Sequence, residues 1–466
     1  EQQGEPETPE EPDEPEPEAE PHYEREPEAE PQPPAETSED DAEAEPSEEI
    51  LWSEDEELFA QMGSFDDDNA EKEAKSGASA PGGVHLHGSL ENQLTGLLLR
   101  RPGRSERLSL HDYTRLRIDV DADLPGGVQV RTDAVSRLFV GETLFDLRDL
   151  IPERTLDDAI ARDPAWAAVV ASDAFTYSLQ DELYIDNAYL KIPAGPLLVS
   201  LGKQPLEQGA GYVWNPTDVF IEKEMFDPTY EKEGVVSLRV MIPLGETASL
   251  DLAVAPQNAF EKWTAGGRAR LRLGPLTLGP AAYITRIGGD PEQLLPIADA
   301  RRVMVGGDAV LDVEGIRFWT EGANNFVDDE PEAPEDWWEL SAGVEYFFTF
   351  ETHLMAEYYH YGRGPQQREG LYSLEDWMGL LATELRGLGQ DLIFVSVDHP
   401  IADFWTVGLS SIGSFTDLSA TVMADLRWEF VQDGEIWLLL AGSAGEPEDF
   451  LSSGVGQGWI RVKVYF

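Results

Sequence analysis

The sequence predicts an all-β fold: a closed antiparallel transmembrane up-and-down β-barrel of about 18 strands, preceded by a disordered acidic N-terminal tail. Three observations lead to this prediction. Residues 1–80 are acidic and rich in proline, residues from 84 onward alternate apolar and polar side chains with a period of two, and the connections between the alternating segments are short and long in turn. We therefore expect a tail over 1–80 and a barrel over 81–466.

The tail is defined by its charge. Residues 1–80 hold 31 Asp and Glu against three basic residues, Arg25, Lys72 and Lys75. A stretch such as "EPETPEEPDEPEPEAEP" has little apolar surface to bury and proline at short intervals, so it should remain extended and disordered. The chain has no cysteine, which excludes disulfides, and the segment at its start has no basic and apolar leader, as expected if a signal peptide has been removed.

One island interrupts the tail, at residues 47–62. In "SEEILWSEDEELFAQMG" the apolar residues between Ile50 and Met62 recur at helical spacing, which favours either a marginal helix or a short helix that docks on a partner or against its own domain. The candidate docking residues are Leu51, Trp52, Leu58 and Phe59. We expect the partner to be a periplasmic envelope protein, with a component of polysaccharide export as one candidate.

The alternation begins at Val84. Over residues 113–123 nearly every odd position is charged while the even positions are mostly apolar, and residues 268–273 and 422–430 show the same pattern. A strand with this pattern has one apolar and one ionic face. A soluble β-sandwich also alternates and remains an alternative. No run of about 18 apolar residues occurs, so a membrane-spanning helix is not expected.

The connections separate these possibilities. Tight turns such as "LPGG", "PAGP" and "QDGE" alternate with longer connections. The longer ones lie near residues 140–176, 205–233, 288–300, 363–390 and 444–457. Short turns on one rim and long loops on the other are typical of outer-membrane barrels, in which the short rim faces the periplasm. An even strand number would also place the tail in the periplasm.

Two segments resemble parts of known outer-membrane proteins. The last strand, "GWIRVKVYF", ends on Phe466 and resembles the C-terminal assembly signal of bacterial outer-membrane barrels. The segment "GKQPLEQGAGYVWNPTDVF", residues 202–220, with the preceding "DNAYLKI", resembles large porin-like barrels of Gram-negative bacteria, although Gln208 stands where an aromatic residue is expected. The strand number is similar to that of the 18-stranded alginate and exopolysaccharide export barrels. These resemblances imply an outer-membrane location with lipid and lipopolysaccharide around the barrel.

The segment 202–220 is also the candidate site. It lies in the third long loop, where porins fold a loop into the barrel, and its glycines and "NPTD" turn permit tight reversals. The candidate constriction residues are Lys203, Gln204, Glu207, Tyr212, Trp214, Asn215 and Asp218. The aromatic residues should either line the lumen or pack the loop against the wall. The candidate lumen-lining charges are Arg115, Arg117, Asp119, Arg268, Arg270, Arg272, Glu345, Arg427, Arg461 and Lys463, which could form a basic ladder or a self-neutralising network.

These features favour an outer-membrane channel for a hydrophilic substrate, most of all a polysaccharide export pore coupled to periplasmic machinery. A diffusion porin for small solutes is the first alternative, and a structural anchor or adhesin is the second. No catalytic constellation, metal site or cofactor motif is expected, and neither is a nucleic-acid partner. His85 and His87 lie on one strand face with Glu91, which we interpret as hydrated lumen side chains rather than a metal site.

Overall fold

The computed structural model describes residues 83–99, 107–220, 233–257, 262–288, 299–328, 330, 333–366, 372–381, 385–446, 448–452 and 455–466. Within these ranges 18 strands form one sheet. In chain order they are β1 (Val84–Leu99), β2 (Arg107–Leu124), β3 (Val128–Gly141), β6 (Glu182–Ala194), β7 (Leu197–Gln204), β8 (Val235–Pro243), β9 (Ala248–Gln257), β10 (Lys262–Leu273), β11 (Leu276–Ile287), β12 (Ala300–Val313), β13 (Ile316–Val327), β14 (Trp337–Phe347), β15 (His353–Tyr361), β16 (Asp391–Ala402), β17 (Trp405–Ser414), β18 (Ala420–Val431), β19 (Gly434–Ala444) and β20 (Val455–Tyr465).

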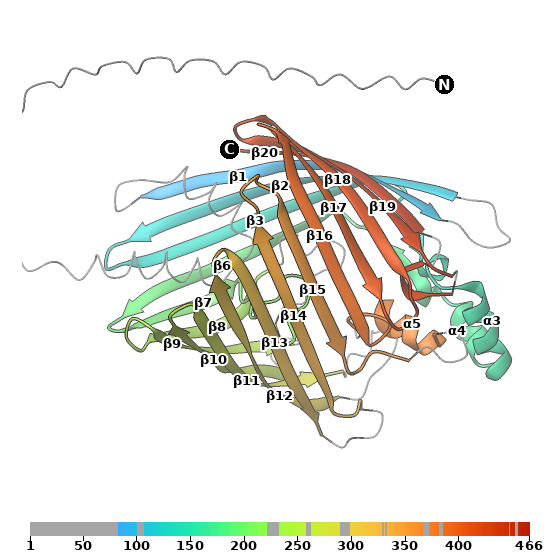
Figure 1. Cartoon of the computed structure of the whole chain (residues 1–466), viewed down its shortest axis with the longest axis horizontal. Coiled ribbons are helices and arrows are strands. Elements are labelled where there is room, and N and C mark those ends of the chain that lie inside the picture. Colours follow the sequence, from blue (N-terminus) through green and yellow to red (C-terminus); the bar gives the residue numbers. More distant parts are fainter. Residues whose placement is uncertain are drawn as a thin grey trace, which may run out of the picture. The chain divides into compact units, whose positions relative to one another are not determined.

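The sheet closes on itself. Each strand pairs with its neighbours in the chain in antiparallel fashion, and β1 pairs with β20 as well as with β2, so that Leu90 stands beside both Val464 and Leu116. Figure 1 shows the strands following one another around the barrel wall. The predicted closed antiparallel barrel of 18 strands is therefore confirmed. Closure matters because it leaves no strand edge without hydrogen-bond partners.

The short connections lie where the sequence predicts them. The turn between β2 and β3 contains Gly126 and Gly127, whose φ angles of 86° and 74° lie in the left-handed region that glycine adopts readily. Both glycines follow Pro125, so the chain reverses directly and starts β3 at Val128. This turn fixes the register of the two strands that carry the charged residues described below.

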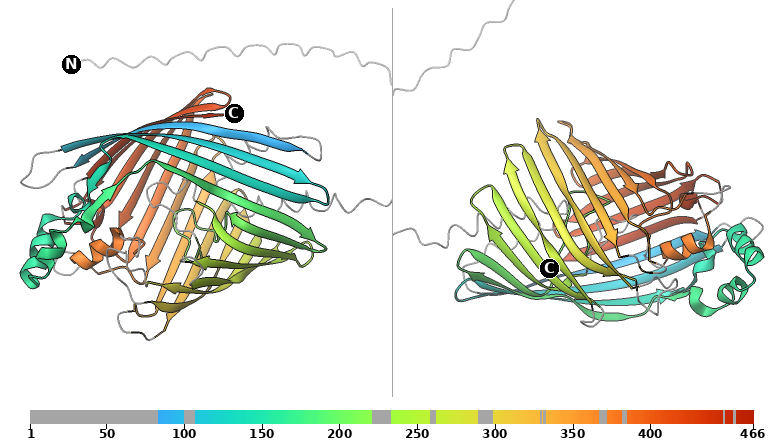
Figure 2. Two further views of the ribbon diagram at one scale, coloured as in Figure 1. Left: turned by 180° about the vertical axis from the view of Figure 1, so that it is seen from behind. Right: turned by 90° about the horizontal axis from the view of Figure 1, so that it is seen from below.

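The long connections contain structure of their own. The β3–β6 connection holds the hairpin β4 (Leu144–Asp146) and β5 (Thr176–Ser178), with η1 (Leu147–Asp149), α3 (Glu153–Arg162), α4 (Trp166–Val170) and η2 (Asp173–Phe175) between these two strands. The β15–β16 connection holds α5 (Leu374–Leu381), and the last one holds η4 (Phe450–Ser452). The helices α3, α4 and α5 lie together at one end of the barrel (Figure 2). No described helix is long and apolar enough to cross a membrane.

The two faces of the wall differ in polarity. On β1 the side chains of Leu86, Leu90 and Leu94 are exposed on the outside, whereas Glu91 and Gln93 between them are buried on the inside. The same alternation continues around the barrel, with exposed outer residues such as Ile118, Val254, Phe318, Val422 and Ile460. A continuous exposed apolar surface of this kind is unfavourable in water and favourable in a lipid bilayer.

The seam between β1 and β20 gives a test of closure. Phe466 exchanges two backbone hydrogen bonds with Gly88, at 2.9 and 3.0 Å. The Phe466 ring also packs against Gly88, because a Cβ atom at that position would lie only 2.9 Å from a ring carbon. Deletion of Phe466 removes these contacts and should lower the fraction of barrel that assembles in detergent or vesicles, measured as heat-modifiable migration on gels. Deletion of residues 1–40 is the control, and equal assembly of both variants would contradict a role of the terminal residue in closure.

Candidate functional site

The candidate site is the connection that leaves β7 and runs through residues 205–220. Most of its residues are buried, including Leu206, Val213 and Thr217. Its hydrogen-bond partners are side chains on the inner face of β10, β13 and β15, the face opposite the exposed apolar residues, and Arg386 in the β15–β16 connection. The loop therefore lies inside the barrel, against one part of the wall.

The first attachment is made by Glu357 on β15. Its carboxylate accepts three consecutive backbone N–H groups of the loop, from Tyr212 at 2.6 Å, Val213 at 3.2 Å and Trp214 at 2.9 Å. Ser341 on β14 adds a hydroxyl donor at 3.3 Å. A buried carboxylate needs several donors to offset the loss of water, and here the loop backbone supplies them. The charge of Glu357 thus fixes the conformation of residues 212–214.

Glu321 on β13 makes the second attachment. It accepts the backbone N–H groups of Ala210 and Thr217, both at 2.7 Å, and of Gly211 at 3.3 Å, together with the Thr217 hydroxyl at 2.7 Å. Gly209 precedes these donors with a φ of 117°, and a Cβ atom there would lie 2.6 Å from a Glu321 oxygen. Glycine is required at this position because the backbone approaches the carboxylate closely.

Further contacts hold the other end of the loop. Arg386 donates to the carbonyl oxygens of Asn215 at 3.0 Å and Asp218 at 3.2 Å, and it pairs with Glu339 on β14 at 3.2 Å. The Asp218 carboxylate accepts the N–H groups of Gln208 and Phe220, both at 2.9 Å, which closes the loop on itself. Asp218 and Asn215 therefore serve the shape of the loop.

The aromatic residues of the loop pack against the wall. Trp214 is 4% exposed and stacks on Tyr359 of β15 with a centroid distance of 5.1 Å and an interplanar angle of 8°. Tyr212 lies 5.6 Å from the ring of Phe394 on β16. The aromatic residues of the loop were expected either to line the lumen or to pack the loop against the wall. In the structure, Trp214 and Tyr212 pack against rings of the wall.

The other long connections join the same apolar cluster. Its buried members include Ile151 and Phe175 from the β3–β6 connection, Trp377 from α5 and Phe450 from η4, packed with Trp214 and Tyr359. Asp417, in the β17–β18 connection, accepts the Tyr372 hydroxyl at 3.1 Å and the Phe450 N–H at 2.8 Å. Burial and this carboxylate raise the pKa of Tyr372, so the phenol stays protonated and remains a donor.

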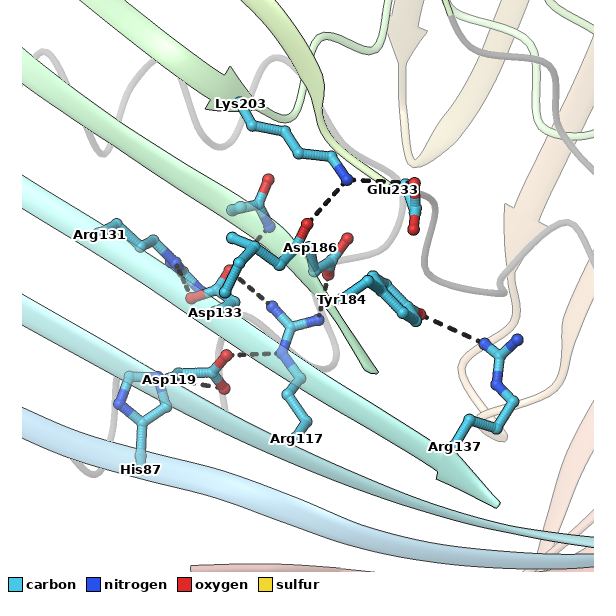
Figure 3. A network of polar contacts seen from close by, with 12 residues as sticks. His87, Arg117, Asp119, Arg131, Asp133, Arg137, Tyr184, Asp186, Lys203 and Glu233 are labelled. Atoms are coloured by element: carbon cyan, nitrogen blue, oxygen red, sulfur yellow. Dashed lines mark hydrogen bonds and ion pairs between the residues drawn. The ribbon is translucent and has the colours of Figure 1, made fainter. Parts of the chain in front are cut away.

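A charged network lines the part of the wall on β2, β3 and β6 (Figure 3). Its centre is Arg117, which contacts Asp119 at 2.7 Å, Asp133 at 2.9 Å and Asp186 at 3.0 Å. Asn187 also donates to Asp133, at 2.7 Å. β3 stands half of the 18-strand circumference away from β14, so this network faces the loop across the lumen. The loop and the charged network thus occupy opposite parts of the inner wall.

The other candidate lumen charges also lie on the inner face. Arg115, Arg268 and Lys463 are buried there, and Arg268 pairs with Asp308 at 2.6 Å and donates to Thr217 of the loop at 2.8 Å. The remaining pairs are Glu345 with His353 at 3.2 Å, Arg427 with Asp425 at 3.3 Å and Arg461 with Glu91 at 3.9 Å. Arg270 and Arg272 share a face of β10 with Arg268, and their cross-strand neighbours are Ser249 and Thr277, respectively. Mutual pairing therefore dominates over a continuous basic ladder.

The remaining constriction candidates differ in position. Lys203 and Gln204 end strand β7 and do not belong to the loop. Lys203 donates to the Ile185 carbonyl at 2.8 Å and to Glu233 at 3.1 Å, which holds it beside β6. Gln204 is buried, whereas Glu207 is exposed. Among the candidates that lie in the loop, Glu207 and the half-buried Tyr212 are the ones left accessible to water.

Several site residues were not among the sequence candidates. Glu357, Glu339 and Arg386 hold the loop although they are more than 100 residues away from it, and only their place on alternating strands or in a long loop hinted at a lumen position. In the described part of the chain no group of three or more His, Asp or Glu could hold a metal ion. The docking residues Leu51, Trp52, Leu58 and Phe59 lie outside the described residues.

No protein-family model matches the chain, and no curated protein matches it. Solved structures similar to it include OccAB4 of Acinetobacter baumannii, with 11% identity over 84% of this chain and 99% of that chain and a TM-score of 0.48. OccK11 (OpdR) of Pseudomonas aeruginosa has 10% identity over 82% of this chain and 96% of that chain, also with a TM-score of 0.48. OmpT, an outer membrane protein of Vibrio cholerae, has 10% identity over 83% and 100% of the chains and a TM-score of 0.41.

Proposed function

We propose that the protein is an outer-membrane channel of a Gram-negative bacterium through which small hydrophilic solutes diffuse. The observation that carries the proposal is the loop 205–220, which buried carboxylates of the wall hold inside an otherwise charged lumen. The outer apolar surface supports a bilayer location, because a closed barrel satisfies its backbone without water. A wide barrel leaves an aqueous interior unless loops fill it, and here the loop narrows one side.

Passage of a polysaccharide has less support than the sequence suggests. An aromatic ring that faced the lumen could stack on sugars, but Trp214 is 4% exposed and its face is covered by Tyr359. The long connections add apolar packing beside the loop rather than an exposed aromatic track. Coupling to a periplasmic partner depends on residues 47–62 and remains a separate proposal, as does the periplasmic position of the tail.

A size series separates the two substrates. Liposomes containing the protein should swell in small sugars at rates that fall steeply with molecular size, and purified polysaccharide should neither enter nor block the channel. Planar bilayers should show discrete conductance steps, as expected for a water-filled pore. Empty liposomes and heat-unfolded protein are the controls. A folded barrel without steps or swelling would contradict the proposed channel.

A further inference from the structure

Four lumen side chains, Arg427 on β18, Trp437 on β19, and Trp459 and Arg461 on β20, form a cluster of guanidinium groups and indole rings, called the stack below, in which the two indoles also meet edge to face at 5.0 Å. Arg427, Trp437 and Arg461 stand side by side in the strand register. The Arg427 Cζ atom lies 4.3 Å from the Trp437 ring centroid, and the Arg461 Cζ atom lies 5.4 Å from Trp437 and 4.5 Å from Trp459. Each guanidinium is within cation–π distance of an indole.

The stack runs from a buried end to an exposed end. Trp459 is 7% exposed, and the Arg461 side chain, 11% exposed, donates to Gln93 at 2.7 Å. Trp437 is held by its indole N–H, which donates to Asp425 at 3.2 Å. The Arg427 side chain is 40% exposed. The last member of the stack is thus a guanidinium that water reaches.

Arg427 differs from the other central lumen arginine. Arg117 is 9% exposed and has carboxylate contacts of 2.7 to 3.0 Å, which use its in-plane donors. Arg427 lies 3.3 Å from Asp425 and 3.7 Å from Asp398, longer than the roughly 2.7–2.9 Å of a charge-assisted hydrogen bond. Its position is therefore set largely by the face of Trp437, which leaves the guanidinium able to take another partner.

We propose that this exposed end binds planar aromatic solutes that carry hydroxyl groups, such as catechol. A guanidinium plane has two faces, so a ring placed on the face away from Trp437 continues the stack by the same cation–π attraction. The Asp398 carboxylate, 28% exposed and 3.7 Å from Arg427, is placed to accept a phenolic O–H. Asp398 and Asp425 together disfavour a ligand with its own carboxylate, because like charges would repel.

Gly408 makes room for this arrangement. It lies between Asp398 and Asp425 on the neighbouring strand β17, and a Cβ atom there would collide with the Asp425 carboxylate and lie 2.9 Å from an Asp398 oxygen. Both carboxylates can therefore approach Arg427 from the same side. The inference rests on the proposed channel, because the stack faces the lumen of that channel. It names the class of solute that the channel prefers.

The test measures binding and conduction separately. Isothermal titration calorimetry of the full-length protein in detergent should show catechol binding about five- to tenfold more tightly than cyclohexane-1,2-diol, which has the hydroxyl groups without the ring. The variant Arg427→Gln should lose this preference. The control Arg131→Gln removes another lumen guanidinium, 30% exposed and paired with Asp121 and Asp133, and should keep it. Trp437→Phe should retain part of the preference.

Three outcomes separate the claims. Equal affinity for the two diols in the wild-type protein, or an unchanged preference in Arg427→Gln, would overturn the aromatic site. In planar bilayers catechol should reduce the current more than cyclohexane-1,2-diol does. If current steps appear but the two diols reduce the current equally, the proposed channel is supported and the aromatic site is contradicted. Binding without current steps would instead contradict the proposed function. Heat-modifiable migration confirms that each variant is folded.

Discussion

Replacement of Arg117 by Met is expected to lower the free energy of unfolding by about 3–5 kcal/mol at neutral pH. The guanidinium is 9% exposed and contacts three carboxylates, of which Asp119 and Asp133 are 2% and 0% exposed. Without it these charges are left together in a place with little water, and each repels the others. Urea titration of the protein refolded into phospholipid vesicles measures the change.

The matched control is Arg131→Met on the neighbouring strand. Arg131 also contacts Asp133, at 3.3 Å, but it is 30% exposed, so its loss should cost about 1 kcal/mol or less. Adding Asp133→Asn to Arg117→Met should recover part of the stability, because it removes one of the uncompensated charges. Equal losses in the two arginine variants would show that the three carboxylates do not depend on Arg117.

The wall could be predicted from the sequence because its rules are local. Side chains alternate across a strand, and turn residues mark each reversal, so Leu90 and Glu91 can be assigned to opposite faces without knowledge of their neighbours. The same rule places Arg117, Arg268 and Lys463 on the inner face, where the structure has them. Closure follows for a sheet in a bilayer, because lipid offers no hydrogen-bond partners to an open strand edge.

The contents of the lumen could not be predicted in the same way. The two carboxylates that hold the loop, Glu321 and Glu357, are 104 to 145 residues away from their loop donors in the chain, and they meet the loop because the barrel closes. No local pattern distinguishes Glu357, which binds the loop, from Glu345 on the preceding strand, which binds His353. Helix α3 did have a local signal, the helical spacing of Leu156, Ala159 and Ile160, within a stretch expected only as a loop.

The position of Trp214 shows the same limit. The sequence places it in a loop that enters the lumen, and both a water-facing ring and a packed ring satisfy that placement. The structure shows the packed ring, because the buried ring of Tyr359 lies parallel to Trp214 at a centroid distance of 5.1 Å. Tyr359 is on the same face of β15 as Glu357, whose carboxylate binds the loop backbone. An aromatic face is covered when an equally apolar face is within reach. The burial of Trp214 is what shifts the proposed substrate from polymers to small solutes.

The double variant Glu321→Gln and Glu357→Gln is expected to release the loop and raise the single-channel conductance towards that of a variant with residues 209–217 shortened. Each carboxylate accepts backbone N–H groups at three loop positions. Glutamine has nearly the same size, but it is neutral and presents an N–H₂ donor where the loop also offers donors. Hydrogen bonds to charged groups contribute about 1.5–3 kcal/mol each. The free energy lost with the hydrogen bonds of both carboxylates should therefore exceed the free energy that the packing of Trp214 contributes to holding the loop.

The barrel itself should remain folded in this variant, because the ladder hydrogen bonds of β13 and β15 do not involve the two side chains. Limited proteolysis should then cut within 205–220 from the long-loop side, a region protected in the wild type. The control Glu345→Gln changes another inner carboxylate that contacts His353 and Arg317 but not the loop, so its conductance should equal that of the wild type. A double variant with wild-type conductance and an uncut loop would mean that apolar packing alone holds the loop in place.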